Sequence, residues 1–359
     1  MSHPIDAVAG VPATTWKPSI EDRLKVNNFD GLRLIFASMV VVFHIGLLSQ
    51  QPELAPLHWW VSSTFAVQAF FFVSGFLVVM SFDRGKSLRS YFKKRTLRIA
   101  PAYIAVILAA AFLLAPLSTL PASEFFSSAE WRSYVVSNLM LSNFNQPDLP
   151  GVFQQNYEVA VNGSLWTIKI EVMFYCSVPF IVWAIRKLDY KIVLATIFVG
   201  SLIWQCGFVY LGEATGNDLY ARLAKQLPGQ LSFFAAGAFA YYRTAGGLPP
   251  PPAWAAVGGI ILYAVTDGLL HHVVAPFSVA LFTYWASIGL QQLWSSHKWG
   301  DFSYGVYLYH FPIAQTMISL GVFAAAPYLG LVAVCAATLL VSVASWHLIE
   351  KKALRFAHR

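Results

Sequence analysis

Charged residues are scarce in this chain of 359 residues, making up 11% of it against 57% hydrophobic residues. An ordinary globular chain is roughly 25% charged and about 45–50% apolar. Cysteine is scarce as well: Cys176, Cys206 and Cys335 all lie in apolar runs without metal-ligand spacing. The composition therefore excludes a typical water-soluble domain and a disulfide framework, and it predicts a membrane protein without a metal site.

The N-terminal region lacks the apolar core of a signal peptide. Residues 1–28 are polar, and the first long apolar run begins only after them. We therefore expect no cleaved signal peptide, and we expect the first membrane span to act as its own targeting signal.

Long apolar runs are abundant, and ten of them approach the roughly 20 residues that a helix needs to cross the hydrocarbon core. The sequence therefore predicts an all-α, polytopic membrane bundle of about ten transmembrane helices. We expect this domain at 29–350, between a short segment at 1–28 and a basic tail at 351–359. The ten runs are 31–50, 59–81, 99–117, 165–185, 191–211, 227–243, 253–271, 274–294, 302–321 and 327–349.

Lysine and arginine are unevenly distributed over the loops between these runs. Of 24 such residues, 19 fall on one side of the predicted membrane, three on the other, and Arg33 and Lys169 within spans. Short cytoplasmic loops are rich in Lys and Arg, so we expect both termini in the cytoplasm and the loop 118–164 outside. The net charge of +7 then reflects topology, and nucleic acid is not expected as a partner.

Two polar residues share one face of the first predicted span. Arg33 and His44 in "DGLRLIFASMVVVFH" are eleven residues apart, about 20° beyond three full helical turns and roughly 16 Å in rise. They form a stripe from the cytoplasmic surface to the middle of the membrane. The alternative is structural: Arg33 extends to the interface and His44 donates to a carbonyl of a neighbouring helix.

Two further spans carry polar groups where a buried charge is costly. In "NGSLWTIKIEVMFY" Glu171 and Tyr175 are four residues apart and share an inward face, whereas Lys169 points elsewhere. In "WGDFSYGVYLYHFP" Ser303, Tyr307 and His310 recur at helical spacing. These groups are expected to line a cavity, although an interhelical ion pair and ordinary packing are the respective alternatives.

A basic cluster precedes the third span in "KKRTLRIAP". Arg95 and Arg98 are three residues apart, and we expect them where this span emerges, with Pro101 in its first turn. Two guanidinium groups on one face can clamp phosphate bidentately. Anionic lipid headgroups are the competing ligand, and for Lys93 and Lys94 membrane lipids are the preferred partner.

Taken in order, these motifs resemble the acyltransferase family 3 membrane proteins, bacterial enzymes that acylate cell-surface glycans. The resemblance covers nearly the whole chain after residue 28. It rests on Arg33 and His44, on "FFFVSGFL" at 70–77, on "RTLRIAP", on "GSLWTIKIE" ending at Glu171, and on "FSYGVYLYHFP" and "WHLIEKKALRF".

The resemblance implies an O-acyltransferase of the bacterial inner membrane. It would move an acyl group from cytoplasmic acyl-CoA, with acetyl-CoA as the default donor and succinyl or a longer chain open, to a hydroxyl of a cell-surface or lipid-linked glycan. We expect a stand-alone form without the esterase-like domain that some members carry after the last span. The alternative from another class is a transporter or flippase for a glycolipid or a small anion.

The same resemblance suggests roles for individual residues. His44 would be the general base toward the acceptor hydroxyl or would carry the acyl group itself, and Glu171 would orient the histidine or the acceptor. Glu350 is expected to pair with the basic cluster. The residues expected to bind CoA are Arg33, Arg95 and Arg98, and those expected at the substrate are His310, Tyr307, Tyr175 and Trp166.

Overall fold

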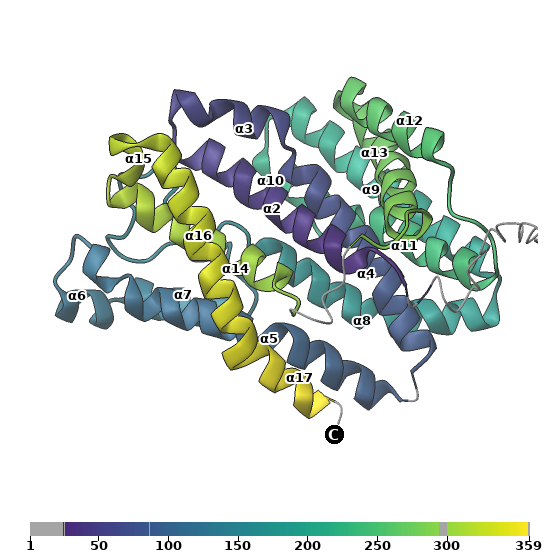
Figure 1. The fold of residues 1–359 in the computed structure, drawn as a ribbon, viewed down its shortest axis with the longest axis horizontal. Coiled ribbons are helices and arrows are strands. Elements are labelled where there is room, and N and C mark those ends of the chain that lie inside the picture. The colour runs from purple at the N-terminus through teal and green to yellow at the C-terminus, as the bar shows by residue number, and fades with distance from the viewer. Residues whose placement is uncertain (1–23, 25, 86, 294–299, 358–359) are drawn as a thin grey trace, which may run out of the picture.

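The computed structural model describes residues 24, 26–85, 87–293 and 300–357, and these contain helices and turns but no strand. The all-α, polytopic helical fold predicted from the sequence is confirmed. Most of the expected N-terminal segment 1–28 lies outside the described residues. Figure 1 shows the helices as one bundle, with α2 and α4 crossing its middle.

Seven described helices are long and apolar enough to cross a membrane. The remaining three predicted runs coincide with α11 (Leu227–Ala245), α12 (Ala253–Val265) and α14 (Ser303–Ser319), which are shorter or less apolar. The seven spans are built on α2 (Phe29–Leu48), α4 (Ser63–Asp83), α5 (Leu88–Leu113), α8 (Trp166–Lys187), α9 (Tyr190–Thr215), α13 (Gly268–Tyr284) and α16 (Pro327–Ser345).

Short helices connect or extend the long ones. The region between α5 and α8 contains α6 (Ala122–Ser127) and α7 (Ala129–Leu139). The others are α3 (Ala55–Trp60), α10 (Asp218–Ala224), α15 (Val322–Ala325) and α17 (Lys351–Ala357). Residues 351–357 of the expected tail thus continue the last helix, through a π-helical turn at Trp346–Glu350.

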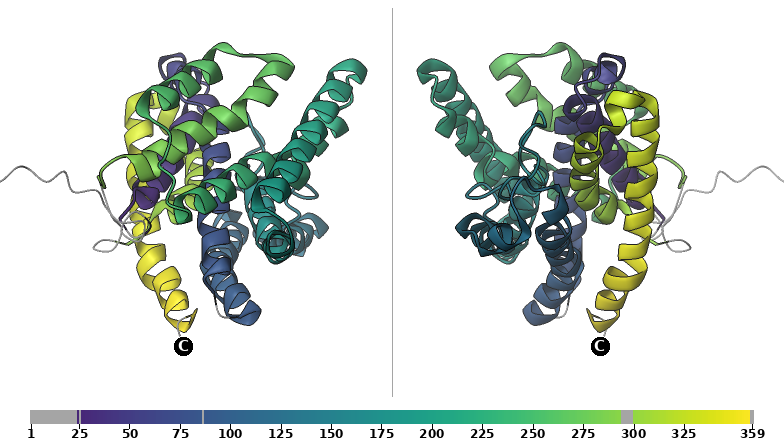
Figure 2. Two further views of the ribbon diagram at one scale, coloured as in Figure 1. Left: turned by 90° about the vertical axis from the view of Figure 1, so that its right-hand side faces the viewer. Right: turned by 90° about the vertical axis from the view of Figure 1, so that its left-hand side faces the viewer.

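The third predicted span begins earlier than expected. The helix α5 starts at Leu88, where the Ser87 hydroxyl accepts a hydrogen bond from the backbone N–H of Ser90. Lysine and arginine are good helix formers, so the basic stretch joins the helix. The expectation of Pro101 in the first turn is therefore wrong: it lies inside α5. Figure 2 shows the early part of α5 extending beside α17 at one end of the molecule, where the two helices pack.

The boundary between the seventh and eighth predicted runs is also wrong. The run at 253–271 is divided, because α12 ends at Val265 and α13 begins at Gly268. Gly268 has a φ of 51°, a conformation that glycine adopts at little cost. The side chain of His271 then turns back toward Thr266.

Close backbone packing fixes α4 in the middle of the bundle. A Cβ atom on Gly237 of α11 would lie 1.9 Å from the carbonyl oxygen of Phe72 on α4, and one on Gly75 would lie 2.0 Å from that of Phe234. Small residues allow membrane helices to approach this closely. The face of α4 opposite α11 is thereby held toward α2 and α8, with which it also packs.

The start of α2 is tied to the end of α13 by Asn28. Its buried side-chain amide donates to the carbonyl oxygens of Ala286, Leu290 and Gln291, and its carbonyl oxygen accepts from the backbone N–H of Leu293. These are backbone groups that a helix end leaves without intrahelical partners. The anchor sets the position from which α2 enters the bundle beside α14.

Candidate active site

A cavity of about 430 Å³ lies among α2, α4, α5, α8 and α14. Four of its lining side chains are basic and one is acidic: Arg33, Lys94, Arg95 and Arg98, and Glu171. Nine of the remaining lining residues come from α4, and seven of these nine are apolar. The cavity therefore favours a ligand with an anionic part at the basic residues and a less polar part deeper inside.

The carboxylate of Asp301 connects two of these arginines. Its Oδ2 lies 2.8 Å from Nη1 of Arg33 and 2.5 Å from Nη2 of Arg98. Its Oδ1 accepts from the hydroxyl and the backbone N–H of Ser303, the first residue of α14. Burial acts to raise the pKa of Asp301, but the two arginines and Ser303 outweigh it and hold that pKa well below its usual value.

Arg98 is held on several sides at once. Besides Asp301, its Nη1 lies 3.7 Å from Oε2 of Glu350, which confirms the expected pairing of Glu350 with the basic cluster. Its guanidinium also faces the rings of Tyr304 and Trp346, at 5.7 and 5.9 Å from their centroids. Contacts within the protein thus hold the Arg98 side chain in one position.

Arg95 is in a different situation. Its Nη2 donates to the hydroxyl of Ser81, and its guanidinium lies 5.6 Å from the ring centroid of Tyr175. Its Nε is buried without a hydrogen-bond partner, and in the described part of the chain no carboxylate lies within ion-pair distance of it. Of the expected arginine pair, Arg95 is the member with unused binding capacity.

Glu171 and Tyr175 both line the cavity, as the shared inward face predicted. The Tyr175 hydroxyl donates to the Glu171 carboxylate. In the described part of the chain, Glu171 makes no hydrogen bond to His44. Trp166, at the start of α8, is half-buried and does not line the cavity.

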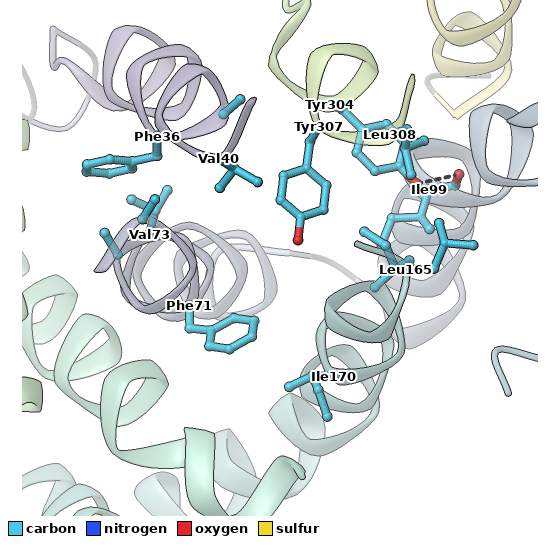
Figure 3. Close-up of a cluster of buried hydrophobic side chains, with 14 of the residues drawn as sticks. Phe36, Val40, Phe71, Val73, Ile99, Leu165, Ile170, Tyr304, Tyr307 and Leu308 are labelled. Carbon is cyan, nitrogen blue, oxygen red and sulfur yellow. Dashed lines mark hydrogen bonds between the residues drawn. The ribbon is translucent and has the colours of Figure 1, made fainter. Parts of the chain in front are cut away.

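Tyr307 closes the inner end of the cavity. Figure 3 shows its side chain reaching from α14 into the space between α2, α4 and α8. Its hydroxyl lies 2.7 Å from the hydroxyl of Thr167 and 3.3 Å from the carbonyl oxygen of Ser164, both near the start of α8. The ring of Phe70 packs edge-on against it.

The two mid-helix histidines contact each other beyond Tyr307. Nδ1 of His44 lies 2.8 Å from Nε2 of His310, with the ring planes within 6° of parallel. Neither histidine lines the cavity itself. The sequence predicted His44 near the middle of the membrane and His310 in the lining of a cavity, whereas in the structure His310 lies against His44 instead.

The backbone around His310 fixes the proton positions of the pair. Nδ1 of His310 lies 2.8 Å from the carbonyl oxygen of Tyr307 and 3.2 Å from that of Val306. A carbonyl oxygen only accepts, so this nitrogen carries the proton, and Nε2 of a neutral His310 is an acceptor. His44 must then donate through Nδ1, which leaves its Nε2 with a lone pair. This is the tautomer that a general base requires.

Asp301 is the functional residue that sequence reasoning missed. It stands in the quoted stretch "WGDFSYGVYLYHFP", two residues before α14 begins. A carboxylate there is also favoured by the positive end of the helix dipole. In the described residues, no three side chains of His, Cys, Asp or Glu converge into a possible metal site.

The chain is similar to one family model and to two proteins of known sequence. The family model described as "Acyltransferase domain" matches residues 26–347. An O-acetyl transferase of Shigella phage Sf6 is 29% identical over 343 residues, which covers 92% of this chain and 96% of the phage protein. Nodulation protein 10 of Rhizobium leguminosarum bv. viciae is 25% identical over 378 aligned residues, covering 92% and 93% of the two chains. No solved structure matches.

Asp301→Asn should lower the free energy of unfolding by about 3 kcal/mol, because it leaves two largely buried guanidinium groups without their shared carboxylate. The folded-state pKa of Asp301 is below its unfolded value, so its contribution is complete above about pH 4 to 5 and is lost as the pH falls further. Denaturant unfolding of the purified protein at pH 7 measures the whole effect.

The matched control is Asp189→Asn. Asp189 is exposed and caps α9 by accepting from the backbone N–H of Lys191, a role that asparagine fills equally well. Equal, small effects of both substitutions would show that Asp301 does not hold the arginines.

Proposed function

The chain belongs to the acyltransferase family whose domain model matches residues 26–347, and from this premise we propose that it transfers an acyl group from acyl-CoA to a hydroxyl of a cell-surface or lipid-linked glycan. It is a membrane acyltransferase; acetyl-CoA is the proposed donor. The observation that carries the proposal is the basic cavity that ends at Tyr307, directly before the His44–His310 pair.

The basic end of the cavity suits the donor. A CoA thioester carries phosphates at one end and its reactive carbonyl at the other. Arg95 and Lys94 would bind phosphate, and among the described residues no carboxylate lies within ion-pair distance of the Arg95 guanidinium. Since CoA is a cytoplasmic metabolite, this end would face the cytoplasm, and the protein would reside in the inner membrane with both termini on that side.

Arg33 and Arg98 would act from fixed positions. Asp301 holds both guanidinium groups, and Arg33 also lines the cavity. A positive group that is already oriented costs little reorganisation when negative charge develops on the thioester oxygen. Arg33 would stabilise that charge or contact CoA, and Arg98 would mainly set the geometry of the cavity wall.

The histidine pair would supply the base. Nε2 of His44 takes the proton of the acceptor hydroxyl while the hydroxyl oxygen forms a bond to the thioester carbon. The C–S bond then breaks, CoA leaves as a thiolate, and the proton on His44 neutralises it. His310 is a positioning residue that keeps His44 in the required tautomer, and Glu171 with Tyr175 would bind substrate rather than orient His44.

A second route through the same residue stays open. His44 could attack the thioester with Nε2 and carry the acyl group briefly before the acceptor displaces it. Both routes need the lone pair on Nε2 of His44. Tyr307 and Thr167 line the cavity, and we propose that their hydroxyls contact the thioester.

Arg95→Ala should weaken acetyl-CoA binding roughly tenfold to a hundredfold, because a hydrogen bond to a charged group contributes about 1.5–3 kcal/mol. Equilibrium binding to the purified protein measures this. Arg89→Ala, an exposed residue of the same helix outside the cavity, is the matched control. Unchanged affinity in Arg95→Ala would assign this arginine to lipid headgroups.

His44→Ala should reduce acyl transfer by a factor of about 10² to 10⁴, the usual contribution of a general base, while acetyl-CoA affinity stays near the wild-type value. Arg33→Lys should also lose activity, because an ammonium group cannot reproduce the planar guanidinium that contacts Asp301. Steady-state transfer and binding assays separate the two effects, with His272→Ala on α13 as the control.

The mechanism would be wrong if His44→Ala still transferred acyl groups at the wild-type rate. If either variant failed to accumulate as folded protein in the membrane, while His272→Ala accumulated normally, the residue would be structural.

A further inference from the structure

A second cavity, of about 530 Å³, lies among α9, α11 and α13 and shares no lining residue with the first. These three helices pack against one another, and Figure 1 shows them side by side on the part of the bundle away from α14 and α16. The proposed reaction makes no use of this cavity.

Small side chains account for the cavity between these helices. Five alanines from the three helices line it, and their methyl groups leave room that larger residues would fill. The rings of Phe198, Phe239 and Phe277 form much of the remaining wall. The one lining hydroxyl in the deeper part belongs to Tyr284, and it is already hydrogen-bonded to Thr244. The alanines are Ala195, Ala235, Ala236, Ala240 and Ala280.

One end of this cavity is basic. Lys191 lies in the first turn of α9 and Arg243 in the last turn of α11, and both line the cavity. The two helix ends meet, since the ring of Tyr190 stacks on that of Tyr242 at 5.2 Å. Among the described residues, no acidic side chain lines the cavity and neither basic group lies within ion-pair distance of a carboxylate.

We propose that this second cavity binds an anionic membrane phospholipid, with its phosphate at Lys191 and Arg243 and an acyl chain between the phenylalanines. From Lys191 to Phe198 the helix rises roughly 10 Å, so the basic end and the apolar interior fit one amphiphile. A free inorganic anion would leave the apolar part unfilled, and a neutral lipid would leave the two cations uncompensated.

The basic end also has the correct location for a lipid headgroup. Lys191 is exposed at a helix end, where the Pro-rich connector Gly246–Pro252 passes beside it with Pro251 in the cavity lining. Arg243 donates to the carbonyl oxygen of Pro249 on this connector. The bound lipid would therefore link α9, α11 and the connector, independently of whether acyl transfer occurs.

The test uses the purified full-length protein in detergent and two lipids with identical acyl chains, phosphatidylglycerol and phosphatidylcholine. Native mass spectrometry gives the affinity for each. We expect preferential retention of phosphatidylglycerol, and in the double variant Lys191→Gln/Arg243→Gln its affinity should fall roughly 30-fold, at about fivefold for each basic residue near an anionic headgroup. The matched control, Lys187→Gln/Lys352→Gln, removes two exposed lysines outside the cavity.

A second variant tests the apolar part without changing charge. Ala236→Leu should fill the cavity and reduce phosphatidylglycerol binding, whereas Ala336→Leu on the exposed face of α16 should not. Equal retention of both lipids by the wild type would overturn the proposal, as would unchanged phosphatidylglycerol affinity in either cavity variant. Binding of inorganic phosphate with the same affinity as the lipid would overturn it as well.

Discussion

The shared carboxylate of Asp301 is the contact on which the rest of the site depends. Three helices meet there: α2 and α5 each bring an arginine, and α14 begins two residues later. Two guanidinium groups so near to each other would repel, and burying them without a counter-charge would be costly. Asp301 removes that cost, so Arg33 and Arg98 can remain beside a cavity instead of extending to the nearest interface.

From this contact α2 and α14 run parallel into the bundle, and together they determine where His44 and His310 lie. Arg33 to His44 on α2 rises roughly 16 Å. Asp301 precedes α14 by two residues and lies nine residues before His310, which is roughly 14 Å at helical rise. Helices joined at Asp301 therefore bring the two histidines to the same depth, where they contact each other. The cavity extends from the arginines to Tyr307, and the two histidines lie beyond Tyr307. The arginines and the proposed base His44 are therefore at opposite ends of the site.

The sequence was sufficient for features that depend on one helix. Helical spacing predicted the inward face of Glu171 and Tyr175, and the apolar runs predicted the all-α bundle. Contacts between residues on two different helices could not be predicted from the sequence. Asp301, the partner of Arg33, is 268 residues away in the chain, and the sequence around Arg33 gives no indication that the two residues meet. For the same reason Glu171 was expected to orient His44 or the acceptor, whereas in the structure the residue that contacts His44 is His310.

We propose that the basic cavity receives a cytoplasmic acyl-CoA whose acyl group is transferred, and sealed membrane vesicles of both orientations would distinguish this from transport. Acetyl-CoA labelled in the acetyl group is supplied from outside the vesicles, and release of CoA thiol is measured together with incorporation of label into membrane glycan. Inside-out vesicles should release CoA and incorporate label, and right-side-out vesicles should do neither. Accumulation of label in the vesicle lumen without CoA release would contradict the account and favour a transporter.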